Sequence, residues 1–255
     1  MKRKASLALA ALTAAAALSL SGCGNLEAFV IYNAMLEKEE SVFSRDYETL
    51  SSIELTGEDW EYTRFTESTE TEVYLDSGTQ SAVYGRYLDS DNNYFDYEMF
   101  YKDGYVYQNS QGLKMRFPSL GDAFTQASEA IEKDLGAGAL TYCVVKDLDN
   151  GGKTITLQVD TDAVRDYLGD YEQTLMNTLN IGGAADLTIT EFMYQLTVDS
   201  EFYNDGCTYF VFADITLEDG TPVRMLMAEE IRVTGRNNTQ RVNYPGDLSS
   251  YTDVF

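Results

Sequence analysis

Residues 94–107 read YFDYEMFYKDGYVY and show how most of this chain folds. Every second position is apolar, the spacing at which side chains share one face of a β-strand. These positions are Phe95, Tyr97, Met99 and Tyr101. Asp103-Gly104 then offers the positive φ angles of a tight hairpin, and Tyr105-Val106-Tyr107 forms the returning strand. The stretch therefore predicts antiparallel β-structure.

The same alternating pattern extends in both directions from this hairpin. Alternating strands with short turn signals fill residues 47–117, and they return after residue 183, where Asn204-Asp205-Gly206 and Asp219-Gly220 predict two more turns. The last strands carry Val211, Ala213 and Ile215 on one face and Phe210, Phe212, Met225 and Met227 near the other. Strands that are apolar on both sides are covered on both sides or line a pocket. Residues 242–255 read as a polar tail with aromatic anchors.

Two segments in the middle of the chain have helical rather than alternating periodicity. The first follows Ser119 and ends at Gly136, and the second follows Asp160 or Thr161 and ends at Gly182-Gly183. A β-hairpin over 140–159 separates them, and a further short helix is expected near 25–40. The prediction is one α+β domain: a large, curled antiparallel sheet of about 9–11 strands, with two central helices packed on its concave face.

A ligand space is expected between those helices and the sheet. The candidate ligand-binding residues are Phe124, Ile131, Tyr167, Tyr171, Leu175, Phe212 and Met227.

Charge excludes several functional classes. The 255 residues include 18 Lys and Arg against 42 Asp and Glu and no histidine, a formal net charge of −24. A nucleic-acid partner is not expected, because such an acidic chain is repelled by a polyanion. Without histidine, Ser-His-Asp catalysis and His-ligated zinc are unavailable. No cofactor and no metal site is predicted, and the protein is predicted not to be an enzyme.

The N-terminus has the pattern of an export signal. Lys2, Arg3 and Lys4 precede an apolar run from Ala5 to Leu20, which is followed by Ser21-Gly22-Cys23. Leu20-Ser21-Gly22-Cys23 resembles the lipobox of bacterial lipoproteins, which implies cleavage before Cys23 and acylation of its thiol. The expected divisions are a signal peptide over 1–22, a lipidated N-terminus with a short helix over 23–45, and a single domain over 46–255.

Cleavage would make the protein more acidic. It removes three positive charges and no negative ones, so 15 Lys and Arg would face 42 Asp and Glu, a net charge of −27. This charge also repels anionic headgroups, so the expected membrane contact is through acyl chains on Cys23. An exported monomer, lipid-anchored on the outer face of the cell membrane, is predicted.

Cys143 and Cys207 leave two alternatives open. Both lie in strand-like stretches, and an extracytoplasmic location permits a disulfide between them. Equally, they can be two buried thiols that behave as small apolar side chains.

The order of elements resembles the LolA/LppX-like bacterial lipoproteins, and within them the poorly characterised Gram-positive-type members. The resemblance rests on the lipobox, the hairpin from Tyr101 to Tyr107, and the closing segment Gln240–Pro245 with Asp247, Leu248 and Tyr251. It implies a half-open β-barrel plugged by helices, and a hydrophobic or amphipathic, lipid-like ligand. No catalytic residue is carried over with it.

Other features have simpler explanations. Asp89–Asn93 has alternating oxygen ligands like a calcium loop, but Tyr94 stands where glycine is needed, which favours a solvated turn. Glu58, Asp59 and Glu61, or Glu229 and Glu230, would be the carboxylates of a hydrolase. The 19 Tyr, 12 Phe and 1 Trp suit either an exposed sheet or an aromatic-lined groove for a lipid, peptide or glycan. The alternative to a ligand-binding protein is a structural or protein- or glycan-binding surface module with a filled core.

Overall fold

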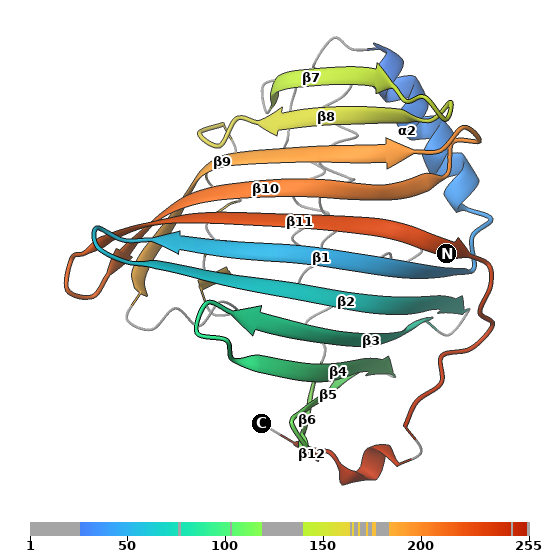
Figure 1. The fold of residues 1–255 in the computed structure, drawn as a ribbon. Coiled ribbons are helices and arrows are strands. Elements are labelled where there is room, and N and C mark those ends of the chain that lie inside the picture. The colour runs from blue at the N-terminus through green and yellow to red at the C-terminus, as the bar shows by residue number, and fades with distance from the viewer. Residues whose placement is uncertain are drawn as a thin grey trace.

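The protein folds around one wide antiparallel sheet (Figure 1). The computed structural model describes residues 26–75, 78–102, 104–118, 140–163, 165, 168, 172, 175, 176, 184–245 and 247–253. Twelve strands pair in the order β12-β6-β5-β4-β3-β2-β1-β11-β10-β9-β8-β7. Since β12 and β7 lie at opposite ends of this order, the sheet is open.

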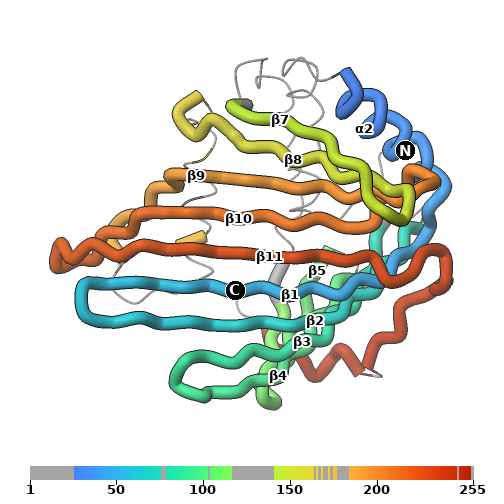
Figure 2. The backbone as a smooth tube through the Cα atoms, turned by 45° about the horizontal axis from the view of Figure 1, so that its top comes forward, coloured from blue at the N-terminus to red at the C-terminus, as the bar shows by residue number. Residues whose placement is uncertain are grey.

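The helix and strands have the following bounds: α2 Leu26–Glu39, β1 Ser44–Thr56, β2 Glu61–Leu75, β3 Gly78–Asp89, β4 Tyr94–Lys102, β5 Tyr105–Ser110, β6 Leu113–Pro118, β7 Leu140–Asp147, β8 Lys153–Val159, β9 Ala184–Val198, β10 Asn204–Leu217, β11 Pro222–Arg236 and β12 Thr252–Asp253. Strands of up to 15 residues twist, and the sheet bends so that β5 and β6 turn back behind its middle strands (Figures 1 and 2).

The two faces of the sheet carry separate hydrophobic cores. We call the face with the larger core the inner face; there Ile189, Val211 and Ile215 are almost fully buried. The opposite, outer face carries a smaller core, in which Val242 and Tyr251 of the C-terminal segment pack with the group Val73, Ala82, Phe100 and Tyr107. The segment that reads as a polar tail therefore crosses the outer face and ends as β12, parallel to β6.

The helix expected near residues 25–40 is present as α2. Its buried side chains have the spacing of one helical face, and all four join the inner core. Lys153 on β8 contacts Glu27 at 3.1 Å, and the Glu39 side chain accepts a hydrogen bond from the Asn204 amide at 2.9 Å. These contacts fasten α2 across one end of the strands. The buried residues are Ala28, Ile31, Tyr32 and Met35.

The predicted α+β fold with two central helices is wrong. The described residues lie mostly in strands, the sheet has 12 strands rather than 9–11, and two helices packed on its concave face are not seen in that part of the chain. Residues 119–139, the first predicted helix, lie outside the described residues, as does most of the second. Helical periodicity shows which side chains would share one face of a helix. It does not show which part of the sheet, if any, that face packs against.

A predicted turn at Asn204-Asp205-Gly206 is also displaced. The chain turns earlier, where the Asp199 carboxylate accepts hydrogen bonds from the amides of Glu201 and Tyr203, both at 2.9 Å. Residues 204–206 instead form an irregularity within β10. Gly206 has φ +136°, and a Cβ there would lie 2.1 Å from the carbonyl oxygen of Ile231. Glycine is needed at this position because two backbones approach closely.

Gly206→Ala should therefore lower the free energy of unfolding by at least about 2 kcal/mol, because both the φ angle and the contact with Ile231 oppose a side chain. Gly220→Ala is the matched control. Gly220 has a similar left-handed φ of +86° but open space around it, so it should cost only about 1 kcal/mol. Urea denaturation of both variants measures the difference. Equal losses would show that the close approach has no role.

Candidate functional site

A band of small side chains crosses the middle of the inner face. Thr49 pairs with Ser68 and Ser51 with Thr66, and Ser68 in turn pairs with Gly85 on β3. These side chains are half-buried. Because these residues are smaller than those on either side, we call this surface the inner trough.

The two margins of the inner trough differ in chemistry. Across β11 and β10, Met227 and Val211 continue the row of Ile53 and belong to the apolar core. Across β3 and β4 the margin is aromatic, with Tyr87 stacked on Phe95 at 4.6 Å between ring centroids. Tyr97 lies over Gly85, since a Cβ on that glycine would come within 2.3 Å of the tyrosine ring.

Two half-buried carboxyl groups, Glu70 and Glu229, lie beside this trough. Burial and the nearby charge of Glu72 raise the pKa of Glu70 to about 8, although a hydrogen bond from Ser81 acts in the other direction. Burial likewise raises the pKa of Glu229, whose carboxylate interacts with the Tyr209 hydroxyl. A carboxyl group with a raised pKa keeps its proton more readily and can donate a hydrogen bond to a polar ligand.

A buried polar cluster lies beyond Glu70, towards α2. Tyr47 and Tyr74 donate hydrogen bonds to the Glu72 Oε2 atom at 3.0 and 2.6 Å. The Arg45 Nη1 atom lies 3.3 Å from the Tyr47 hydroxyl, and its guanidinium forms an ion pair with Glu39. Because Arg45 and Glu72 are both buried, this cluster joins α2 to the sheet by charges that have little contact with water.

The structure separates the two candidate ligand residues of the C-terminal strands. Met227 is buried on the inner face, whereas Phe212 pairs with Leu226 on the outer face and is half-buried. The expectation that they share a face is wrong, because Val211, not Phe212, is the partner of Met227. Leu175 is buried in the inner core. Phe124, Ile131, Tyr167 and Tyr171 lie outside the described residues, and so does Cys23.

The disulfide alternative is not realised. Cys143 on β7 and Cys207 on β10 are both free thiols. The strands β8 and β9 lie between β7 and β10 in the sheet. At about 4.8 Å per strand, the backbones of the two cysteines lie on the order of 14 Å apart, well beyond the reach of a disulfide. Burial raises the pKa of the Cys207 thiol to about 12.

The candidate hydrolase carboxylates do not form a pair. Glu229 points to the inner face, and its neighbour Glu230 points to the outer face, so they cannot flank one bond of a substrate. Glu58, Asp59 and Glu61 are exposed around the β1–β2 turn.

The sequence that resembles a calcium loop is a self-contained turn. The carboxylate of Asp89 accepts hydrogen bonds from the amides of Asp91 and Asn93 and from the Asn93 side chain. These bonds hold the pKa of Asp89 below its usual range. Throughout the described ranges, no group of three or more Cys, Asp or Glu side chains is arranged to hold a metal ion.

Sequence reasoning missed the inner trough and the cluster around Arg45. The signal was present in β2, where the inner positions are Tyr62, Arg64, Thr66, Ser68, Glu70 and Glu72, but it shows only once the inner face is known. In addition, none of the helices that the structure describes is both long and apolar enough to cross a membrane.

Comparison with known proteins gives a limited result. No family model and no curated protein matches the chain. Among solved structures, the chain is similar to LprF from Mycobacterium bovis, with 10% identity and a TM-score of 0.42, over 85% of this chain and 95% of that one.

Two further structures are more distant. A DUF1329 family protein from Desulfovibrio piger has 10% identity and a TM-score of 0.26, over 80% of this chain and 92% of its own. A β-barrel-like DUF1849 protein from Brucella abortus has 10% identity and a TM-score of 0.22, over 76% and 100%. The resemblance to LolA/LppX-like lipoproteins stays a prediction.

Proposed function

We propose that this protein is an exported, lipid-anchored, non-enzymatic protein that binds an amphipathic, lipid-like ligand in the inner trough. The anchor follows from Leu20-Ser21-Gly22-Cys23. The observation that carries the ligand site is the change of chemistry across the inner face, from an apolar core on β8–β11 to small polar residues on β1 and β2.

Each part of the trough suits one part of such a ligand. Apolar chains gain from contact with the Met227 margin and with the aromatic rings of β3 and β4. The polar end needs hydrogen-bond partners once it leaves water, and Glu70, Glu229 and Ser68 supply them. Because raised pKa values favour the protonated carboxyl groups, which donate hydrogen bonds, a polar head with hydrogen-bond acceptors suits the site.

Two neighbouring serines on β1 provide a matched test. Ser51 points into the inner trough, Ser52 points to the outer face, and both are half-buried. Ser51→Trp should fill the trough and reduce the bound ligand at least about tenfold, whereas Ser52→Trp should leave it unchanged. The ligand is extracted from the purified full chain with organic solvent and quantified by mass spectrometry. Occupancy is the amount of extracted ligand divided by the amount of protein.

A wild-type protein that is repeatedly recovered empty, or an equal loss in both variants, would contradict the proposal. The alternative of a surface module with a filled core predicts the empty result. It also predicts that Ser51→Trp is strongly destabilising, because no space would be present for the indole.

A further inference from the structure

The outer face carries a groove that the proposed ligand site does not involve. Two adjoining open hollows of about 760 and 650 Å³ lie side by side over β11, β1, β2, β3 and β4 and share Leu50, Glu67, Arg86 and Glu230. The C-terminal segment covers the neighbouring part of this face but is not among the residues that line either hollow.

The register of the strands arranges the groove in rows. One row, which we call the apolar row, crosses six strands from β10 to β4. Three of its members are large and exposed: Phe65 at 56%, Tyr94 at 49% and Leu88 at 43%. Contiguous exposed apolar side chains of this kind mark interaction sites. The apolar row consists of Phe210, Ala228, Ser52, Phe65, Leu88 and Tyr94.

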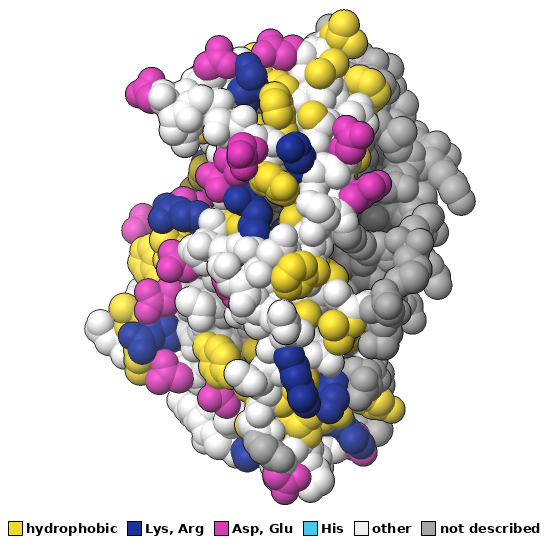
Figure 3. Space-filling view, turned by 90° about the vertical axis from the view of Figure 1, so that its right-hand side faces the viewer, with side chains coloured by type: hydrophobic (Ala, Val, Ile, Leu, Met, Phe, Trp, Pro, Cys, Tyr) yellow, Lys and Arg dark blue, Asp and Glu magenta, His cyan; other side chains and the backbone are white. Residues whose placement is uncertain are grey.

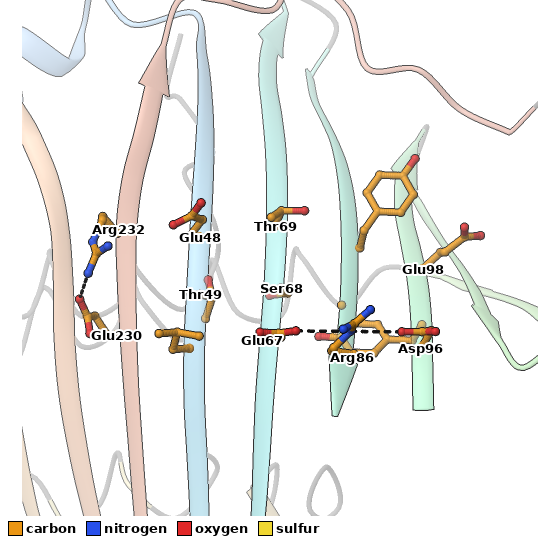
Figure 4. Close-up of a pocket in the computed structure, with 14 residues that line it drawn as sticks. Glu48, Thr49, Glu67, Ser68, Thr69, Arg86, Asp96, Glu98, Glu230 and Arg232 are labelled. Atoms are coloured by element: carbon orange, nitrogen blue, oxygen red, sulfur yellow. Dashed lines mark hydrogen bonds and ion pairs between the residues drawn. The ribbon is translucent and has the colours of Figure 1, made fainter. Parts of the chain in front are cut away.

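The next two rows, both on one side of the apolar row, carry charged side chains that are predominantly acidic. Figure 4 shows Arg86 between Glu67 and Asp96, at 3.3 and 3.5 Å, and Arg232 beside Glu230 at 2.8 Å. Glu48 and Glu98 lie in the same rows. Five carboxylates therefore face two guanidinium groups. Figure 3 shows a neighbouring side of the molecule, where acidic and basic side chains are interspersed with hydrophobic ones.

These features define the chemistry of an occupant. It must present an apolar stripe to the apolar row and positive charge to the acidic rows beside it. A second copy of this chain and an anionic membrane surface both carry net negative charge and are disfavoured. A straight row across six strands is about 24 Å long, which matches about 16 residues of α-helix.

We propose that this groove docks a basic amphipathic α-helix of a partner protein. The helix lies across the strands, with its apolar face on Phe65, Leu88 and Tyr94 and its Lys or Arg side chains over Glu48, Glu67 and Asp96. This is the helix-in-groove mode of recognition, in which apolar anchors supply affinity and charge sets orientation.

A synthetic helix tests the proposal on the full chain. The probe is a peptide of about 16 residues of Leu and Lys, with Leu at helical spacing, and a scrambled peptide of the same composition is its control. Fluorescence anisotropy should show tighter binding of the amphipathic peptide by about tenfold or more. Equal binding of the two peptides would show that binding depends only on non-specific charge attraction, and this would overturn the proposal.

Variants locate the binding. Phe65→Ser should weaken binding about tenfold, and Glu48→Lys should weaken it about threefold or more, with a smaller salt dependence. Tyr142→Ser is the matched control for the aromatic change, because Tyr142 is 46% exposed on β7. Glu201→Lys, in the exposed β9–β10 turn, is the control for charge.

Unchanged peptide binding in Phe65→Ser, or an equal loss of binding in the control variants, would overturn the docking proposal. Self-association of the protein that Phe65→Ser abolishes would also overturn it, because the occupant would then be a second copy of the chain. Ligand occupancy in the inner trough should not change in Phe65→Ser. The two proposals therefore fail independently.

Discussion

Replacing Arg45 by methionine should destabilise the protein by about 3–5 kcal/mol, the cost of leaving a buried charge without its partner. The Arg45 side chain is buried between Glu39 of α2 and the Tyr47–Glu72–Tyr74 group of the sheet. Burial raises the pKa of Glu72, because water cannot solvate its charge. Without the guanidinium, Glu72 must stay charged in a poor environment or take up a proton. Urea denaturation near neutral pH measures the loss.

Two comparisons show whether the effect belongs to the cluster. Arg224→Met removes an exposed guanidinium from the same sheet and should change stability by no more than about 0.5 kcal/mol. The double variant Arg45→Met with Glu72→Gln should be clearly less destabilised than the sum of the two single variants, because the carboxylate that needs the cation is gone. Strictly additive losses would mean that the two residues act separately.

Stability should fall by roughly 3 kcal/mol as the pH rises from about 5 to 9, largely through Glu70. In the unfolded chain this carboxyl group loses its proton near its ordinary pKa of 4.5, whereas in the folded protein it keeps the proton until about pH 8. Between these values the folded state binds more protons, so a rise in pH favours unfolding. Glu70→Gln should flatten this dependence and stabilise the protein at pH 9.

The control is on the same strand. Glu67 points to the outer face and its side chain is 58% exposed, so Glu67→Gln should leave the pH dependence as it is in the wild type. Urea denaturation midpoints of the wild type, Glu70→Gln and Glu67→Gln at pH 5, 7 and 9 measure the pH dependence of stability. A Glu70→Gln variant that loses stability with pH as steeply as the wild type would show that Glu70 is ionised at neutral pH.

Local sequence predicted much of the strand structure. Alternation in residues 94–107 corresponds to β4 and β5, and Gly104 and Gly220 have the left-handed φ angles expected at their turns. These features depend on the chain within a few residues. The turn predicted at residues 204–206 is misplaced because the reason for Gly206 is not local. Glycine is needed there because the carbonyl oxygen of Ile231, 25 residues further along the chain, leaves no room for a side chain.

The candidate sites were predicted less well, because a site depends on which residues meet across strands. Alternation in β10 separates Val211 from Phe212, but only the pairing with β11 shows that Met227 lies with Val211. Likewise, Glu70 and Glu229 are 159 positions apart, and three-dimensional pairing of β2, β1 and β11 brings both to one face. No local pattern carries this information.

The sequence by itself determined the antiparallel strands, the apolar stripe of α2 and the acidic charge, because each follows from side chains close together in the chain. Only the tertiary structure decided that the sheet has 12 strands, that the C-terminal segment covers part of the outer face, and that the small inner trough and the acidic outer groove lie on opposite sides of the same strands. The physical reason is register. A strand fixes two faces through its alternation, but which neighbours share each face is set by backbone pairing between distant segments.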